Sequence, residues 1–122
     1  MTARSMLLDA VNALEAAFAE AATLEGDGFE EHRKEVVRLR RQIAAQNATI
    51  ATLCDAAFEQ PERRQAFHSE FSKMRSAMAF HQASWPAVAI DFQNPGYLSS
   101  LQSMRDAHRT FIAWSKIALA KS

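Results

Sequence analysis

The sequence predicts an all-α protein, an antiparallel four-helix bundle that forms a single domain over residues 1–122. Three observations support this fold class. Ala, Leu, Glu, Arg and Lys account for 56 of the 122 residues, close to the composition of long-helix proteins. Gly and Pro number only three each, too few for the many turns of a β-sandwich or barrel. Apolar residues also recur three and four positions apart in four segments that short connections join.

The first helix is expected over about residues 2–25. Its apolar stripe has helical spacing, with acidic residues between the apolar ones. Gly26 follows at the position where a glycine often ends a helix, because it adopts positive φ without a Cβ penalty. The stripe consists of Met6, Leu7, Val11, Leu14, Phe18, Ala21 and Ala22.

The second helix is expected to be the longest, over about residues 28–59. Asp27 and Glu30 have the spacing of a capping box, which marks its start. The steps of its stripe alternate between three and four residues, as in a coiled-coil seam. Because this helix should outrun its neighbours by several turns, part of its stripe is expected to lack an intramolecular partner. The stripe consists of Phe29, Val36, Leu39, Ile43, Gln46, Ile50, Leu53 and Ala57.

Two further helices complete the predicted bundle. Pro61 suits the first turn of the third helix, where its missing N–H would be unpaired in any case. The stripe of this helix runs from Phe67 to Trp85 and includes His81. The fourth helix is expected from Tyr97 to Ala120. Its inner face consists of Leu101, Met104, His108, Phe111, Ile112, Ser115 and Ala118.

The connection at residues 85–97 is expected to be a short helix or an apolar loop. It contains two prolines and an Asn-Pro-Gly turn signal, but also five large apolar residues. Burying one such side chain is worth roughly 1.5–3 kcal/mol, so this segment should not stay in water. It should either cap the open end of the bundle or form a contact surface for a partner. The five residues are Trp85, Val88, Ile90, Phe92 and Tyr97.

Charge and cysteine content exclude several classes of function. The 14 basic and 14 acidic residues balance, so overall charge does not draw the chain onto nucleic acid. Residues 33–41 are rich in Arg and Lys, but these spread around the polar side of a helix, without interleaved aromatic residues. No apolar run approaches the roughly 20 residues that a membrane span needs. We therefore expect a cytoplasmic protein with no nucleic-acid or membrane partner. The single cysteine, Cys54, excludes an intrachain disulfide and is expected to be a buried, inert thiol.

Charge is nevertheless uneven along the chain. Residues 1–31 carry seven acids and one arginine, a net charge of −6, so residues 32–122 sum to +6. Either the acidic first helix lies beside the more basic helices, or a basic surface meets an acidic partner.

The four histidines, His32, His68, His81 and His108, do not form a recognisable motif. No Glu lies three residues before any of them, as a di-iron bundle would require. None is followed by the residues typical of histidine phosphotransfer domains, and no Gly-x-Ser-x-Gly or His-Glu-x-x-His motif is present. We therefore predict no catalytic residue, no metal ligand and no cofactor. His81 and His108 both fall on apolar stripes and could meet across the third and fourth helices. A His-based signalling or metal-binding bundle is therefore the alternative.

The function predicted from these patterns is protein binding without catalysis. The chain is expected to be a small helical adaptor or chaperone-like module that self-associates as a homodimer through its long second helix, or captures a partner helix there. Gln46 is a polar residue on the seam, where such a residue can fix register. In general shape the bundle is similar to small helical adaptors and secretion chaperones. The expected partner-binding residues are Ile43, Gln46, Ile50, Trp85, Ile90, Phe92 and Tyr97.

Overall fold

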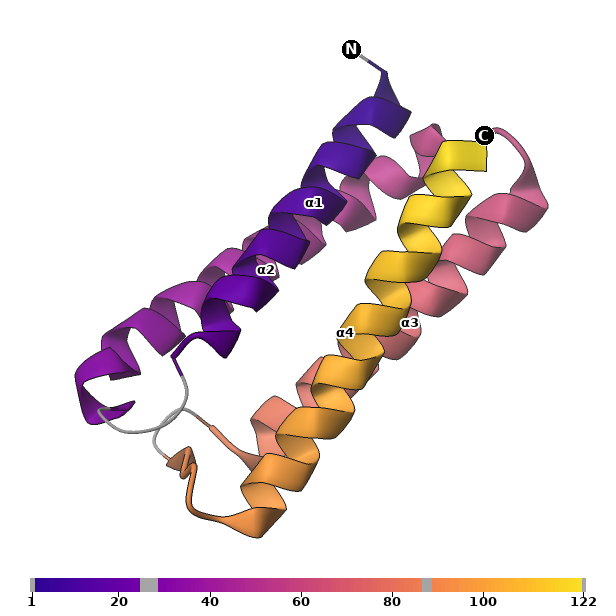
Figure 1. Cartoon of the computed structure of the whole chain (residues 1–122). Coiled ribbons are helices and arrows are strands. Elements are labelled where there is room, and N and C mark those ends of the chain that lie inside the picture. Colours follow the sequence, from indigo (N-terminus) through magenta and orange to yellow (C-terminus); the bar gives the residue numbers. More distant parts are fainter. Residues whose placement is uncertain (1, 25–28, 87–88, 122) are drawn as a thin grey trace.

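The computed structural model describes residues 2–24, 29–86 and 89–121, and confirms an all-α bundle. Four helices run up and down in turn, and within the described ranges there is no β-strand (Figure 1). Gly26, the expected end of the first helix, and Asp27, the expected cap of the second, lie outside the described residues, and so does the side chain of Glu30. The helices are α1 (Ala3–Ala22), α2 (Phe29–Ala57), α3 (Pro61–Ser84) and α4 (Pro95–Lys121).

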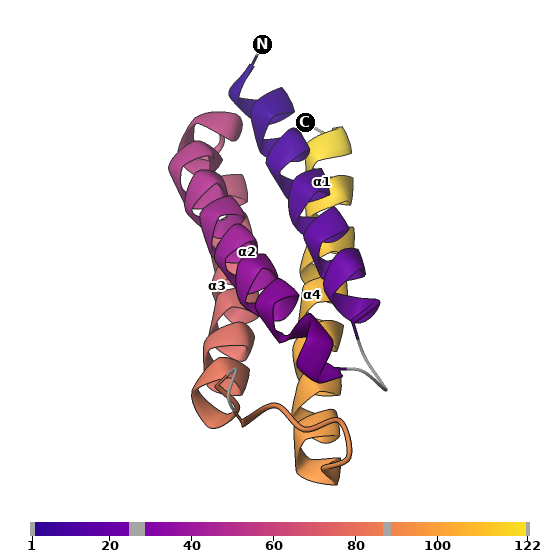
Figure 2. The same ribbon diagram turned by 90° about the vertical axis from the view of Figure 1, so that its left-hand side faces the viewer.

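The bundle consists of two helical hairpins, which form its two layers (Figure 2). The α1–α2 pairing is the most extensive, followed by α3–α4, and the α2–α3 interface is the sparsest of the four. We call the end where α1 begins and α4 ends the terminus end, and the end where α3 ends and α4 begins the loop end. In Figure 1, α1 and α4 lie close together at the terminus end and separate toward the loop end. The two hairpins are therefore packed unevenly along their length.

Local signals in the sequence explain three of the helix starts. The Thr2 hydroxyl accepts a bond from the Ser5 backbone N–H at 3.0 Å, and the Ser5 hydroxyl accepts one from the Thr2 N–H at 3.1 Å. This is a reciprocal capping box. Pro61 occupies the first turn of α3, as predicted. The Asn94 side-chain oxygen accepts from the Gly96 N–H at 2.8 Å, so the Asn-Pro-Gly turn also caps α4.

The core has two parts. The larger part fills the terminus end and the middle of the bundle with apolar residues from all four helices. Its centre is an aromatic group around Phe67, whose ring lies 5.4–6.1 Å from the rings of Phe58, Phe71, Phe111 and Trp114. The smaller part lies at the loop end and consists of Ile90, Tyr97 and Leu101, with Val36, Trp85, Phe92 and Met104 packed against them.

The connection between α3 and α4 is an apolar loop over its described residues. The Ala89 N–H donates to the Pro86 carbonyl at 2.8 Å, and the Asn94 N–H donates to the Asp91 carbonyl at 3.0 Å, so turns shape the described part of this connection. Ile90 is buried and Phe92 is half-buried against Tyr97. The loop therefore caps the end of the bundle, one of the two roles expected for it. Val88 lies outside the described residues.

The expectation that part of the α2 stripe lacks an intramolecular partner is wrong for Ile43 and Ile50. Their exposed fractions are 6% and 0%, and both belong to the larger core. Against α4 the length argument fails, because α4 has 27 residues and α2 has 29, although α1 has only 20. The α4 helix begins two residues earlier than predicted, where Asn94 caps it, and α2 packs mainly against α1. None of the helices in the described part of the chain is long and apolar enough to cross a membrane.

The polar residue of α2 that is buried in the bundle is Asn47, which follows Gln46 in the sequence. Asn47 is 9% exposed, whereas Gln46 is half-buried. The Asn47 side-chain nitrogen contacts the sulfur of Met78 at 3.7 Å, a weak acceptor, and its side-chain oxygen has no hydrogen-bond partner. A buried polar atom without a partner lowers stability by about 1–3 kcal/mol. Asn47 is therefore a site where the sequence does not maximise stability.

We predict that Asn47→Leu raises the free energy of unfolding by about 1 kcal/mol, because leucine fills similar space without the unpaired oxygen. Urea denaturation followed by circular dichroism measures the change. Gln46→Leu, at the neighbouring half-buried position, should shift it by less than about 0.5 kcal/mol. A lower unfolding midpoint for Asn47→Leu than for the wild type would contradict this assignment.

Candidate functional site

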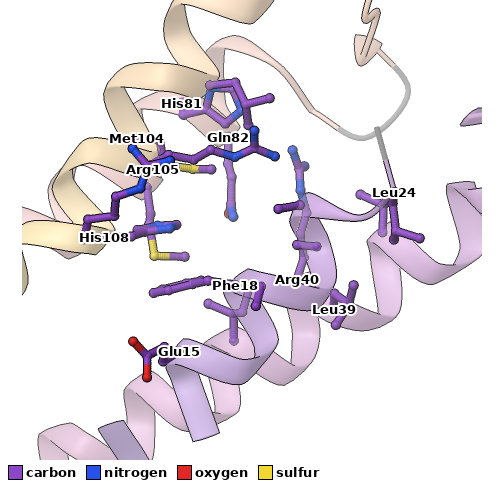
Figure 3. A pocket seen from close by; sticks show the side chains of 18 of the residues that line it. Glu15, Phe18, Leu24, Leu39, Arg40, His81, Gln82, Met104, Arg105 and His108 are labelled. Carbon is purple, nitrogen blue, oxygen red and sulfur yellow. The ribbon is translucent and has the colours of Figure 1, made fainter. Parts of the chain in front are cut away.

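A large pocket opens between the two hairpins at the loop end, with a volume of about 580 Å³. All four helices and the connection before α4 contribute to its lining. Figure 3 shows side chains of α1, α2, α3 and α4 arranged around one common space. The pocket lies between the two parts of the core, since Ile43 and Ile112 of the larger part and Tyr97 of the smaller part all line it. Its size falls in the range typical of ligand and partner sites.

The walls of this loop-end pocket are mainly apolar. Leu39 and Ile43 line it from α2, Met78 from α3, and Leu101 and Ile112 from α4. Small residues of α1, among them Ala19 and Ala22, line it opposite α4 and leave the space open. An apolar space of this size exposed to water is costly, so it favours an apolar occupant.

The structure brings four of the seven expected partner-binding residues to this pocket: Ile43, Ile90, Phe92 and Tyr97. Trp85 is not in the lining, but its ring meets the Tyr97 ring edge-on at 5.4 Å and so supports the wall from behind. Gln46 and Ile50 lie farther along α2, outside the pocket.

The pocket carries more positive than negative charge. Four cationic side chains line it, and Glu15 is the single carboxylate among its lining residues. Glu15 accepts a hydrogen bond from the Lys116 ammonium at 2.5 Å, which neutralises one of the cations. The four cationic residues are Arg40, Arg105, Arg109 and Lys116.

Arg40 is a pocket cation that links two helices through a hydrogen bond. It is half-buried, and its guanidinium donates to the Trp85 backbone carbonyl at 3.1 Å, which links α2 to the end of α3. Burial lowers the pKa of Arg40, since the charged group has lost water, and it also lowers the pKa of Arg105. Two half-buried guanidinium groups beside an apolar space would be stabilised by an anionic occupant.

His81 and His108 meet at the same pocket, as the sequence suggested they could. They are 2% and 5% exposed. His81 Nδ1 lies 2.6 Å from the Ser100 hydroxyl, and the His108 ring stacks on Phe18 with centroids 3.6 Å apart. Nε2 of each ring is buried without a hydrogen-bond partner. Both rings therefore bring an unpaired polar atom to the lining of an apolar pocket.

Both of these histidines are held in the neutral form. Burial is the main cause and lowers the pKa of His108 to about 3, with a further contribution from the positive charge of Arg105. Burial and Arg40 also lower the pKa of His81. Because both rings are buried, neither suits a phosphotransfer histidine, which must reach a partner. Among the described residues, neither belongs to a group that could hold a metal.

A second cluster, which the sequence analysis missed, lies at the α2–α3 hairpin and consists of Cys54, Asp55 and His68. Its signal was present in the sequence. Cys54 and His68 each lie seven residues from Pro61, on opposite sides of the proline that separates the two predicted helices, and the structure brings them together. Cys54 is buried, as predicted, and burial raises the pKa of its thiol. The thiol therefore lacks the lowered pKa of an activated nucleophile. The His32 side chain lies outside the described part of the chain.

Comparisons of the chain with protein family models, with curated proteins and with solved structures find no match.

Proposed function

We propose that the protein is a non-enzymatic binding module that captures an amphipathic, acidic helix of a partner protein in the loop-end pocket. The observation that supports this most strongly is the pocket itself, an apolar space of about 580 Å³ with a cationic lining. We propose no catalytic role, because burial lowers the pKa of both pocket histidines, which weakens them as bases, and the one carboxylate of the lining is paired with Lys116. A general acid–base pair needs groups poised to exchange protons near the working pH.

The extent of the pocket favours a helix as its occupant. Along α4 the lining runs from Tyr97 to Lys116. Nineteen steps of 1.5 Å give a length of about 28 Å, about five helical turns. A helix of that length presents apolar side chains at positions i, i+3, i+4 and i+7 to a complementary apolar surface. Compact metabolites would leave most of such a length uncovered.

The charges of the lining favour acidic residues on the captured helix. Four cations line the pocket against one carboxylate, Glu15. Lys116 is paired with Glu15, and Arg109 with Asp106, which lies outside the lining. Acidic residues flanking the apolar face of a partner helix would meet these cations. Such complementary charges raise association rates and help to exclude basic partners.

Self-association through α2, expected from the sequence, has less support than capture of another protein. Ile43 and Ile50 are buried within one molecule, so a second copy would reach them only if the bundle opened. Of the large apolar side chains that are exposed in the described part of the chain, none belongs to α2; they are Met6, Leu8, Phe80, Leu98 and Ile117. A second copy in the pocket is therefore treated as one outcome of the test.

The test uses a synthetic, fluorescein-labelled helical peptide of about 18 residues, roughly 27 Å long. Leucines occupy one face and glutamates the flanks. Two companion peptides have lysine in place of glutamate, or the same residues in scrambled order. Fluorescence anisotropy should show saturable binding of the glutamate peptide and at least tenfold weaker binding of the other two. Binding should also weaken at higher salt, because charge contributes to it.

Two tryptophan substitutions at alanine positions of α1 test whether the peptide binds in the pocket. Ala19 lines the pocket and Ala16 does not, although both are exposed on the same helix. Ala19→Trp should fill the pocket and weaken peptide binding at least tenfold, whereas Ala16→Trp should leave it unchanged. Equal binding of the three peptides, or equal effects of the two variants, would overturn the proposal.

Two further outcomes identify other occupants and also overturn capture of a partner helix. Saturable binding of dodecanoate that Ala19→Trp blocks, without peptide binding, would assign the pocket to small anionic amphiphiles. A dimer in light scattering that Ala19→Trp dissociates, while Ala16→Trp does not, would assign it to a second copy of the chain.

A further inference from the structure

Three potential metal ligands of the α2–α3 hairpin lie close together, with their ligand atoms within 4.8 Å of one another. Cys54 and Asp55 belong to the last turn of α2, and His68 lies two turns into α3. The hairpin bends at residues 58–60, between the end of α2 and the start of α3, and the two helices bring Cys54 and His68 together even though 14 positions separate them. Their positions therefore follow from the backbone of the hairpin.

The three ligand atoms converge. The Cys54 sulfur lies 3.6 Å from His68 Nε2 and 4.0 Å from Asp55 Oδ1, and His68 Nε2 lies 2.7 Å from Asp55 Oδ1. Zinc bonds of about 2.3 Å to sulfur, 2.0–2.1 Å to nitrogen and 2.0–2.2 Å to oxygen, at tetrahedral angles, place such atoms about 3.4–3.6 Å apart. Both sulfur distances are within about 0.4 Å of that arrangement, and the nitrogen–oxygen distance needs to open by about 0.7 Å.

The contacts fit a shared ion better than a catalytic relay. In a relay, the nucleophile and the carboxylate contact different nitrogens of the histidine ring. Here Cys54 and Asp55 both contact the same nitrogen, Nε2. One proton on Nε2 can serve only one of these neighbours well, whereas an ion between the three atoms satisfies all of them.

The surroundings leave room for the ion and for water. The side chains of Asp55 and His68 are 72% and 51% exposed, so they can move the few tenths of an ångström required. Cys54 is 1% exposed and fixes the inner side of the site. Three protein ligands with an open flank leave a fourth tetrahedral position for a water molecule.

The donor set selects the metal. A thiolate and an imidazole are ligands that zinc prefers, whereas magnesium and calcium prefer oxygen ligands alone. We propose that Cys54, Asp55 and His68 form a binding site for one Zn²⁺ ion that bridges α2 and α3. The ion replaces the thiol proton, which is released to solvent, and becomes bound to the thiolate. Because the α2–α3 interface is less extensive than the α1–α2, α3–α4 and α1–α4 interfaces, a bridge there adds a connection between two sparsely packed helices.

The experiment titrates the full-length, chelator-treated protein with Co²⁺ and with Zn²⁺. Cobalt should give the near-ultraviolet absorption typical of thiolate coordination, and calorimetry should show one zinc ion per chain. Asp55→Asn and His68→Ala, both at exposed positions, should weaken zinc binding at least tenfold. Asp106→Asn removes an exposed, ion-paired aspartate of α4 and is the matched control, for which no change is expected.

Two results would overturn the zinc site. One is the absence of saturable one-to-one binding in the wild type. The other is thiolate–cobalt absorption that survives both Asp55→Asn and His68→Ala at unchanged affinity, because the cysteine would then bind the ion without the other two residues. Cys54→Ser should abolish the absorption. Zinc should also raise the melting temperature of the wild type but not that of Asp55→Asn, since an ion that binds only the folded state stabilises it.

Discussion

Phe67→Ala is expected to lower the free energy of unfolding by about 3–5 kcal/mol, the usual range when a large buried aromatic is removed from a core. Phe67 is fully buried, and its ring contacts four other rings that come from α3, α4 and the α2–α3 turn. Truncation leaves a cavity and removes the aromatic contacts together. Because a domain of this size is stabilised by only about 5–15 kcal/mol, the variant should be close to unfolding.

Chemical denaturation at 25 °C, followed by circular dichroism, measures this loss. Phe80→Ala is the matched control, because Phe80 lies on the same helix with 73% of its surface exposed. Its effect should stay within about 0.5 kcal/mol. Similar losses for the two variants would show that the terminus end of the bundle is not packed around Phe67 as described.

Acidification is expected to destabilise the protein through His108. The pKa of this residue is lowered to about 3 in the folded state, mainly by burial, against about 6.5 in an unfolded chain. As the pH falls below about 6.5, the unfolded state binds a proton at His108 and the folded state does not. The free energy of unfolding therefore has its full value above pH 6.5 and decreases toward pH 3. Between pH 6.5 and pH 4 the loss from this residue alone is about 3 kcal/mol, at about 1.4 kcal/mol per pH unit.

The comparison with His108→Phe isolates this contribution. Phenylalanine keeps a ring stacked against Phe18 but cannot take up a proton. Carboxylates titrate in both proteins, so the difference between the two curves of unfolding free energy against pH reports on His108. That difference should change by about 3 kcal/mol between pH 6.5 and pH 4. Parallel curves would show that His108 is not held neutral in the folded protein.

The sequence predicted the helices well, because each stripe is long and regularly spaced. It placed the start of α3 at Pro61, and the buried residues of that helix, from Phe67 to His81, are those of its predicted stripe. The start of α4 came two residues earlier than predicted, because Asn94 supplies a cap whose energy depends on local geometry. Because α2 is also shorter than predicted, at 29 residues, α4 with its 27 residues is nearly as long, and the argument from unequal lengths fails for this pair.

The pocket could not be predicted in the same way. A stripe shows which face of a helix is apolar, but not whether the facing helices fill the space between them. Ile43 and Ile50 lie on the same seam of α2, yet Ile43 borders the pocket and Ile50 is sealed in the core. The difference arises from how far the two hairpins diverge, which depends on the sizes of side chains from all four helices. The cluster of Cys54, Asp55 and His68 could more nearly have been predicted from the sequence, because its members lie on either side of the connection that ends at Pro61.

The first turn of α1 and the last turn of α4 share one end of the molecule (Figure 1), and most of the residues that line the pocket lie nearer the other end. Affinity tags, fluorophores or surface tethers added at either extremity of the chain therefore project away from any captured helix. Immobilised or fused protein should thus retain full access for its ligand, which makes pull-down and biosensor formats suitable for this molecule without a spacer.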